Sequence, residues 1–203
     1  MRKKLFSTLL SRLFFLYLQF VGRTAKLEVK DSYLIQGNKM VGYWHGDSVP
    51  MMLVLKEIQK GMNEPINIVV TADQRGDYIE NILNFIGAKA IRLPDGLKIR
   101  RFLNQLKELS STQGIVAASL DGPLGPLHEP KKFLFRLARQ GEKEMCYVYL
   151  NYSRAIYLKH RWDNYCIPLP FTQITACVED LGFITQEKLK EFDNFKGQLK
   201  TRA

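Results

Sequence analysis

Residues 40–60 read MVGYWHGDSVPMMLVLKEIQK. The apolar run Met40–Trp44 is typical of a buried strand. The segment from Asp47 onward carries the start signals of a helix, a capping side chain followed by Pro50 in the first turn, and Gly61 marks its expected end. A strand that passes directly into a helix is the repeating unit of α/β folds.

The same alternation continues along the chain. Further strands are expected where β-branched and other apolar residues run together, with helices of about ten residues between them. The expected strands are residues 25–28, 66–72, 88–92, 114–120, 145–152 and 174–178. The expected helices are residues 78–86, 97–109, 131–139 and a charged terminal helix from residue 185 onward. This order predicts an α/β fold with a mostly parallel sheet flanked by helices.

The charge of the chain is concentrated at its start. The 203 residues carry a formal net charge of +10, and residues 1–30 hold seven basic residues against Glu28 alone. A basic excess points to an anionic partner, either nucleic acid or a membrane surface. Here the excess lies beside the most apolar run of the chain, residues 5–21, so an anionic membrane surface is expected and nucleic acid is not.

We expect two units, an interfacial amphipathic helix of residues 1–24 and an α/β domain of residues 25–203. A helix that is apolar over most of its circumference, with basic ends, suits the plane of a bilayer interface. A helix docked on the protein's own core is the main alternative. A signal peptide is disfavoured because no small-residue cleavage site follows the apolar run. A membrane-spanning helix is disfavoured because it would place Arg12 near the bilayer centre.

No metal or organic cofactor is expected. Cys146, Cys166 and Cys177 are odd in number and show no CxxC spacing, which argues against a disulfide framework or a zinc site. The chain also lacks GxxxxGK[ST], GxGxxG, HExxH and GxSxG, so nucleotide hydrolysis, Rossmann cofactor binding, zincin chemistry and the serine-hydrolase elbow have no motif support.

Polar residues follow several expected strands, where ligands bind in parallel sheets. His45 lies just before a helix N-terminus, whose dipole favours the neutral imidazole that a general base requires. Gly46 next to it would let a substrate approach the backbone. Asp121 lies in a turn fixed by two Gly-Pro pairs, and presents either a catalytic charge or a carboxylate bonded to backbone amides.

Two arginines follow neighbouring expected strands. Arg75, in the segment Gln74-Arg75-Gly76-Asp77, and Arg92 could clamp a phosphate between them. Ordinary surface arginines are the alternative for each of them.

Taken in chain order, these motifs resemble one family. They are Trp44-His45-Gly46, Arg75-Gly76-Asp77, residues 87–92, Asp121-Gly122-Pro123 with Gly125-Pro126, Ser153-Arg154-Ala155 and Trp162-Asp163-Asn164-Tyr165. Over residues 40–180 the order resembles the bacterial domain-of-unknown-function branch of the lysophospholipid acyltransferase-like superfamily, with its WHG and DGPxGP motifs. The resemblance implies a glycerolipid acyltransferase-like mixed sheet, peripheral on the cytoplasmic face of the inner membrane.

The resemblance also implies acyl transfer from acyl-CoA or an acyl-carrier protein to a hydroxyl of a lipid or sugar-lipid, in phospholipid or lipid A-type biosynthesis. The superfamily signature is a His that removes the hydroxyl proton and an Asp, five positions on, that orients the ring. His45 matches the His, but Pro50 stands in place of the Asp. Asp47 would point away from His45 on a helix and could replace the acid only if this segment is a loop, whereas Asp121, Asp77 or Asp73 could supply the acid from a neighbouring strand end. Leu124 replaces a phosphate-binding arginine, which disfavours glycerol-3-phosphate as acceptor unless Arg75, Arg92 or Arg154 compensates.

The leading hypothesis is therefore a membrane-associated O-acyltransferase whose co-substrate is an acyl thioester. A non-catalytic lipid-binding protein on the same scaffold is the second hypothesis, and a basic nucleic-acid-binding protein is the third. His45 and Asp121 are the candidate catalytic residues. The candidate substrate-binding residues are Trp44, Gly46, Asp47, Arg75, Asp77, Arg92, Gly122, Pro123 and Arg154.

Overall fold

The computed structural model describes residues 2–63, 65–71, 79–80, 82–83, 87–93 and 113–201. The expected helix at residues 97–109 lies outside these ranges, as does most of the one at 78–86. Arg75, Asp77 and Asp73 also lie outside them.

The described ranges contain both strands and helices. The strands are β1 (Lys26–Lys30), β2 (Lys39–Tyr43), β3 (Asn67–Thr71), β4 (Lys89–Leu93), β5 (Val116–Ser119), β6 (Glu144–Tyr152), β7 (Ala155–Leu158), β8 (Tyr165–Pro168) and β9 (Gln173–Phe183). The helices are α1 (Arg2–Thr24), α2 (Ser48–Gln59), α5 (Lys132–Gln140), α6 (Gln186–Lys190) and α7 (Phe192–Lys196), with short 3-10 turns η1 (Ser32–Leu34) and η2 (His45–Asp47).

Seven strands form one mixed sheet in the order β1-β9-β6-β2-β5-β3-β4. Strands β6, β2, β5, β3 and β4 run parallel to one another, whereas β9 is antiparallel to β6 and carries β1 parallel to itself. The expected α/β fold with a mostly parallel mixed sheet flanked by helices is confirmed. The central strand β2 lies between β5 and β6, so its carboxyl end opens at the middle of the sheet.

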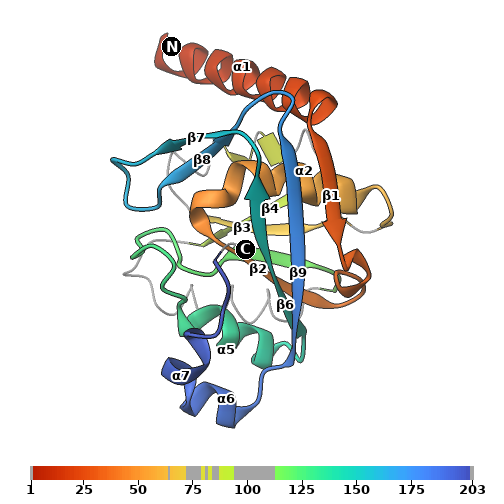
Figure 1. Cartoon of the computed structure of the whole chain (residues 1–203), viewed down its shortest axis with the longest axis vertical. Helices are drawn as coiled ribbons and strands as arrows, with labels where there is room; N and C mark the ends of the chain where they lie inside the picture. The colour runs from red at the N-terminus through yellow and green to blue at the C-terminus, as the bar shows by residue number, and fades with distance from the viewer. Residues whose placement is uncertain are drawn as a thin grey trace.

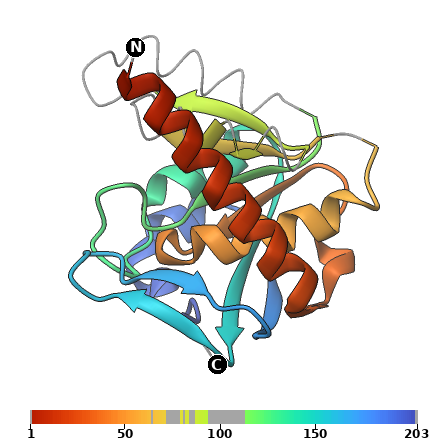
Figure 2. The same cartoon turned by 90° about the horizontal axis from the view of Figure 1, so that it is seen from above.

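Helices cover both faces of the sheet (Figures 1 and 2). The side chains of β2 alternate between the two layers, as a strand period of two requires. Val41 and Tyr43 pack in the core beneath α2, whereas Met40 and Trp44 pack in the core shared with α5, α6 and α7. Met40 and Val41 are completely buried, and each large apolar side chain buried in these cores contributes about 1.5–3 kcal/mol.

Helix α1 lies across the α2 side of the molecule, at one end of its long axis (Figure 1). Its inner face packs on the domain: Leu18 contacts the Val49 and Met52 cluster, and Val21 is completely buried. The hydroxyl of Tyr17 donates a 2.6 Å hydrogen bond to the carbonyl of Pro168 in β8. One face of this helix is therefore docked on the protein's own core. Among the described residues, no helix combines the length and apolarity that a membrane crossing requires.

The hairpin formed by β7 and β8 was not expected from the sequence. The two strands are four residues each and pair only with one another, Leu158 opposite Tyr165. Such short segments carry too few alternating positions to produce a strand pattern. The hairpin matters because its loop, residues 159–164, reaches the start of α2.

Candidate functional site

The candidate site lies where β2 passes into α2. The backbone amide of Leu120 donates a 2.7 Å hydrogen bond to the carbonyl of Tyr43, which continues the parallel pairing of β5 with β2. His45 lies two residues after Tyr43, and Asp121 lies one residue after Leu120. Adjacent parallel strands therefore bring the two sequence-predicted candidates together at the carboxyl edge of the sheet, where open α/β sheets bind ligands.

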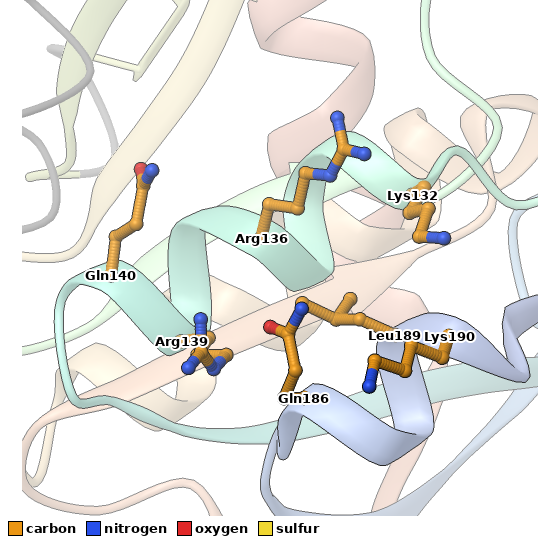
Figure 3. Close-up of a pocket in the computed structure, with 7 residues that line it drawn as sticks. All are labelled: Lys132, Arg136, Arg139, Gln140, Gln186, Leu189 and Lys190. Carbon is orange, nitrogen blue, oxygen red and sulfur yellow. The ribbon is translucent and has the colours of Figure 1, made fainter.

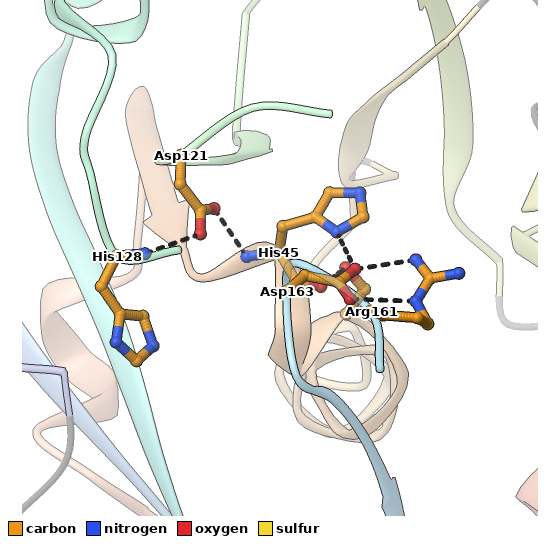
Figure 4. Close-up of polar contacts among 6 residues, drawn as sticks. His45, Asp121, His128, Arg161 and Asp163 are labelled. Atoms are coloured by element: carbon orange, nitrogen blue, oxygen red, sulfur yellow. Dashed lines mark hydrogen bonds and ion pairs between the residues drawn. The ribbon is translucent and has the colours of Figure 1, made fainter. Parts of the chain in front are cut away.

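The His45 ring contacts a carboxylate that neither strand end supplies (Figure 4). Its Nδ1 lies 2.8 Å from Oδ2 of Asp163, in the loop of the β7–β8 hairpin. The Asp163 side chain is fully buried, whereas the His45 side chain is 24% exposed. Asp163 also accepts a bidentate pair from Arg161, at 2.9 Å from Nε and 2.8 Å from Nη2. Sequence reasoning quoted Asp163 only as part of a motif and did not single out Arg161.

The charge state of Asp163 fixes the proton position on His45. Burial alone would raise the pKa of the Asp163 carboxyl, but the hydrogen bonds from Arg161 and His45 outweigh burial and hold that pKa below its ordinary value. An ionised carboxylate only accepts hydrogen bonds, so Nδ1 of His45 carries the proton and donates it to Asp163. Nε2 then holds the lone pair, and no hydrogen-bond partner for it is found among the described residues. This is the arrangement that a general base requires.

Aromatic rings enclose the His45 side chain. The Trp162 ring lies 5.1 Å from it and the Tyr165 ring 6.4 Å, both centroid to centroid. The guanidinium of Arg161 lies 4.9 Å from the Tyr165 ring centroid, and burial raises the pKa of Tyr165 to about 12. Trp162 packs so closely on Gly125 that a Cβ at that position would lie 2.3 Å from a ring carbon. The Asp121–Pro126 turn and the hairpin loop therefore hold one another in place.

Gly46 lies against the backbone of the loop between β7 and β8. A Cβ added there would lie 2.2 Å from the carbonyl oxygen of Asp163, closer than any real contact. In the described structure it is therefore the protein's own chain that approaches the Gly46 backbone.

We predict that Gly46→Ala lowers the free energy of unfolding by about 1–3 kcal/mol, because the clashing atom is backbone and the hairpin has to move as a unit. Urea denaturation measures this change. Gly61→Ala is the matched control, since its nearest neighbour atom would lie 3.8 Å away and its backbone is not left-handed. Equal stability of the two variants would contradict the packing described here.

Asp121 is completely buried and contacts backbone, not the His45 ring. Its Oδ1 accepts a 2.8 Å hydrogen bond from the amide of His45, and its Oδ2 accepts one of 3.3 Å from the amide of His128. Burial raises the pKa of the Asp121 carboxyl despite these amide donors. Of the two readings left open by the sequence, the contacts match the carboxylate bonded to backbone amides, which positions the His45 backbone.

Other sequence-predicted residues lie around this centre. Trp44 faces the opposite helical layer, where its Nε1 donates a 3.0 Å hydrogen bond to the carbonyl of Lys200. Asp47 is buried at the end of η2, with only 2% of its surface exposed. Gly122 adopts a φ of 67°, which favours glycine, and Pro123 after it is exposed. The turn thus presents Pro123 toward solvent beside the buried Asp121.

The structure does not bring the two described candidates, Arg92 and Arg154, to the site. Arg92 is bound by Glu80, with 2.8 Å between its Nε and the carboxylate. Arg154 is exposed at the open end of the hairpin, four residues or about 13 Å of strand from the loop that carries Asp163. Among the described residues, Arg161 is the cation that pairs with Asp163 beside His45.

No cluster of three or more potential metal ligands occurs among the residues described. Cys146 and Cys166 are buried free thiols, and Cys177 is a partly buried one.

Comparison with known proteins yields one distant relative. An uncharacterized protein of Rickettsia prowazekii (strain Madrid E) is 23% identical over 202 residues, which span 96% of this chain and 89% of that protein. No family model and no solved structure matches the chain. The similarity extends over nearly the whole chain.

Proposed function

We propose that this protein is a membrane-associated O-acyltransferase of the glycerolipid acyltransferase-like type, which moves an acyl group from an acyl thioester to a hydroxyl of a lipid or sugar-lipid. The observation that carries the proposal is the hydrogen bond from His45 Nδ1 to the buried, ionised Asp163 at the carboxyl edge of the sheet. Asp163 thereby supplies the acid that is missing from position 50, where the sequence has Pro50.

The reaction needs one group that first accepts and then donates a proton. Nε2 of His45 takes the proton of the acceptor hydroxyl while the hydroxyl oxygen attacks the thioester carbonyl. The C–S bond then breaks, and the proton on Nε2 passes to the departing thiolate to give a free thiol. Asp163 stays ionised throughout and stabilises the transient imidazolium. Arg161 fixes the Asp163 carboxylate in place.

The hypothesis of a non-catalytic lipid-binding protein rested on the missing acid at position 50. Asp163 removes that support, because a lipid-binding role does not call for a buried carboxylate on the ring of a partly exposed histidine. Purified protein incubated with labelled acyl-CoA or acyl-carrier protein and extracted lipids should give labelled lipid within a single turnover. Lipid that binds without any transfer from either donor would favour the lipid-binding hypothesis instead.

We further propose that the outer face of α1 lies on an anionic bilayer, which delivers the lipid acceptor. Leu9, Leu13, Leu16 and Phe20 follow one helical face at spacings of four and three residues, and each is at least half exposed. Phe171, 69% exposed, extends this apolar stripe through an edge-on contact with Phe20 at 6.4 Å between centroids. Exposed Arg12 and Arg23 flank the stripe, as suits anionic headgroups.

The double substitution Phe20→Ser/Phe171→Ser is predicted to weaken binding to phosphatidylglycerol-containing vesicles at least about tenfold, because two aromatic side chains no longer enter the apolar phase. Vesicle sedimentation measures the change. Phe183→Ser is the control, since Phe183 is 58% exposed at the far end of β9. Equal losses in both variants would argue against docking through α1.

A further inference from the structure

The outer face of α5 is mainly basic. Lys132, Arg136 and Arg139 succeed one another at spacings of four and three residues, which places them on one side of the helix. The inner face, led by Leu134, Phe135 and Leu137, is buried in the core. The three cations are therefore mounted on a rigid element. Like charges at these spacings repel one another, so the row is not explained by helix stability.

This face lines a cavity of about 240 Å³ between α5 and α6, shown in Figure 3. Lys190 of α6 adds a fourth cation from the opposite wall, and buried Leu189 lies beside it. Gln140 and Gln186 contribute neutral amides, and no acidic residue lines the cavity among the residues that the structure describes. This cavity, called the cleft between α5 and α6 below, therefore combines four positive charges with two amide groups able to donate hydrogen bonds.

The acidic side chains near this cleft form their ion pairs and hydrogen bonds with other residues. Glu129 and Asp193 both pair with Lys196. Glu187, at the start of α6, hydrogen-bonds to Thr185, with Lys190 and Arg139 as weaker electrostatic neighbours. Within the described part of the chain, no ion pair involves Lys132, Arg136, Arg139 or Lys190. Glu187 and Asp193 are only electrostatic neighbours of these cations, so the positive charge of the cleft is not neutralised by ion pairs within the described residues.

We infer that the cleft between α5 and α6 binds the phosphate groups of a soluble ligand. Two guanidinium forks on one helix face match the oxygens of a phosphate or diphosphate, and lysines supply additional point charge. The volume suits a phosphate or diphosphate group better than a whole drug-sized molecule. The cleft lies at the opposite end of the long axis from α1 (Figure 1), so a bilayer under α1 does not reach it.

Inorganic pyrophosphate, titrated into the full chain by calorimetry, tests the inference. The double variant Arg136→Gln/Arg139→Gln should bind pyrophosphate at least tenfold more weakly, and Lys190→Gln should show a smaller loss. Lys26→Gln/Lys30→Gln, which removes two exposed cations on β1, is the charge-matched control and should bind as the parent does. Equal affinity in all four proteins would overturn the inference.

Two further binding measurements distinguish the possible sources of the phosphate. Vesicles containing phosphatidate should bind the Arg136→Gln/Arg139→Gln variant as well as the parent; a selective loss of vesicle binding would assign the cleft to lipid headgroups and overturn the soluble ligand. Single-stranded RNA should not compete with pyrophosphate at equal phosphate concentration; tighter binding of RNA through the same arginines would overturn it also. None of these measurements uses acyl transfer, so the cleft and the His45 centre succeed or fail independently.

Discussion

Replacing His45 by Ala is expected to lower acyl transfer by about 10²–10⁴-fold, the range that a positioned general base contributes. In the proposed mechanism Nε2 of His45 removes the hydroxyl proton, and the Asp163 hydrogen bond holds the ring in the required tautomer. Alanine removes this base without changing any other side chain. The loss should therefore appear in kcat, with KM for the thioester little changed.

A matched histidine is available as the control. His160 is exposed in the same hairpin loop, so His160→Ala should transfer acyl groups as the parent does. Circular dichroism and urea denaturation of both variants check that the fold is retained, which is expected because His45 is partly exposed. Full activity of His45→Ala in a folded protein would exclude the proposed mechanism.

The junction of β2 and α2 could be predicted because its signals are local. An apolar run, a capping position and Pro50 lie within a few residues of one another, and they place His45 at a strand end without tertiary information. The neighbouring position of Asp121 also followed, since parallel strands align their carboxyl ends. What could not follow was the direction of the Asp121 carboxylate, which two backbone amides determine.

Asp163 escaped prediction for a different reason. It belongs to a hairpin whose strands are too short to show a pattern, and it reaches His45 across 118 residues of sequence. Only the tertiary packing of the loop brings the two together: Gly46 admits the Asp163 carbonyl, and Gly125 admits the Trp162 ring. Small residues in two separate motifs were the available signal, because a glycine often marks a close approach of another part of the chain.

The docked inner face of the N-terminal helix does not exclude the proposed contact of its outer face with a bilayer. Helix α1 buries Leu18 and Val21, whereas Leu13 and Leu16 are exposed. A helix that is apolar over most of its circumference can serve two apolar neighbours. The sequence shows which residues of α1 are apolar, but only the packed structure shows which of them stay exposed.

Asp163→Asn is expected to lower kcat by about 10²-fold or more while KM changes little. Asparagine keeps the size of the side chain but removes the charge that stabilises the imidazolium, and its amide can donate to Nδ1 and so favour the wrong tautomer. Steady-state kinetics of the folded variant measure the change, and an unchanged kcat would contradict the role given to Asp163.

The same substitution should change how stability depends on pH. Because the folded-state pKa of Asp163 lies below its unfolded value, the ionised carboxylate stabilises the native state above the unfolded pKa of about 3.9. That contribution is lost as the pH falls through the folded-state pKa. The deficit in free energy of unfolding of Asp163→Asn, about 2 kcal/mol near neutral pH from its charge-assisted hydrogen bonds, should therefore shrink below about pH 4. Urea titrations at pH 7 and pH 3 measure the difference, and a deficit that stayed constant would mean that the charge of Asp163 is not what the hairpin loop depends on.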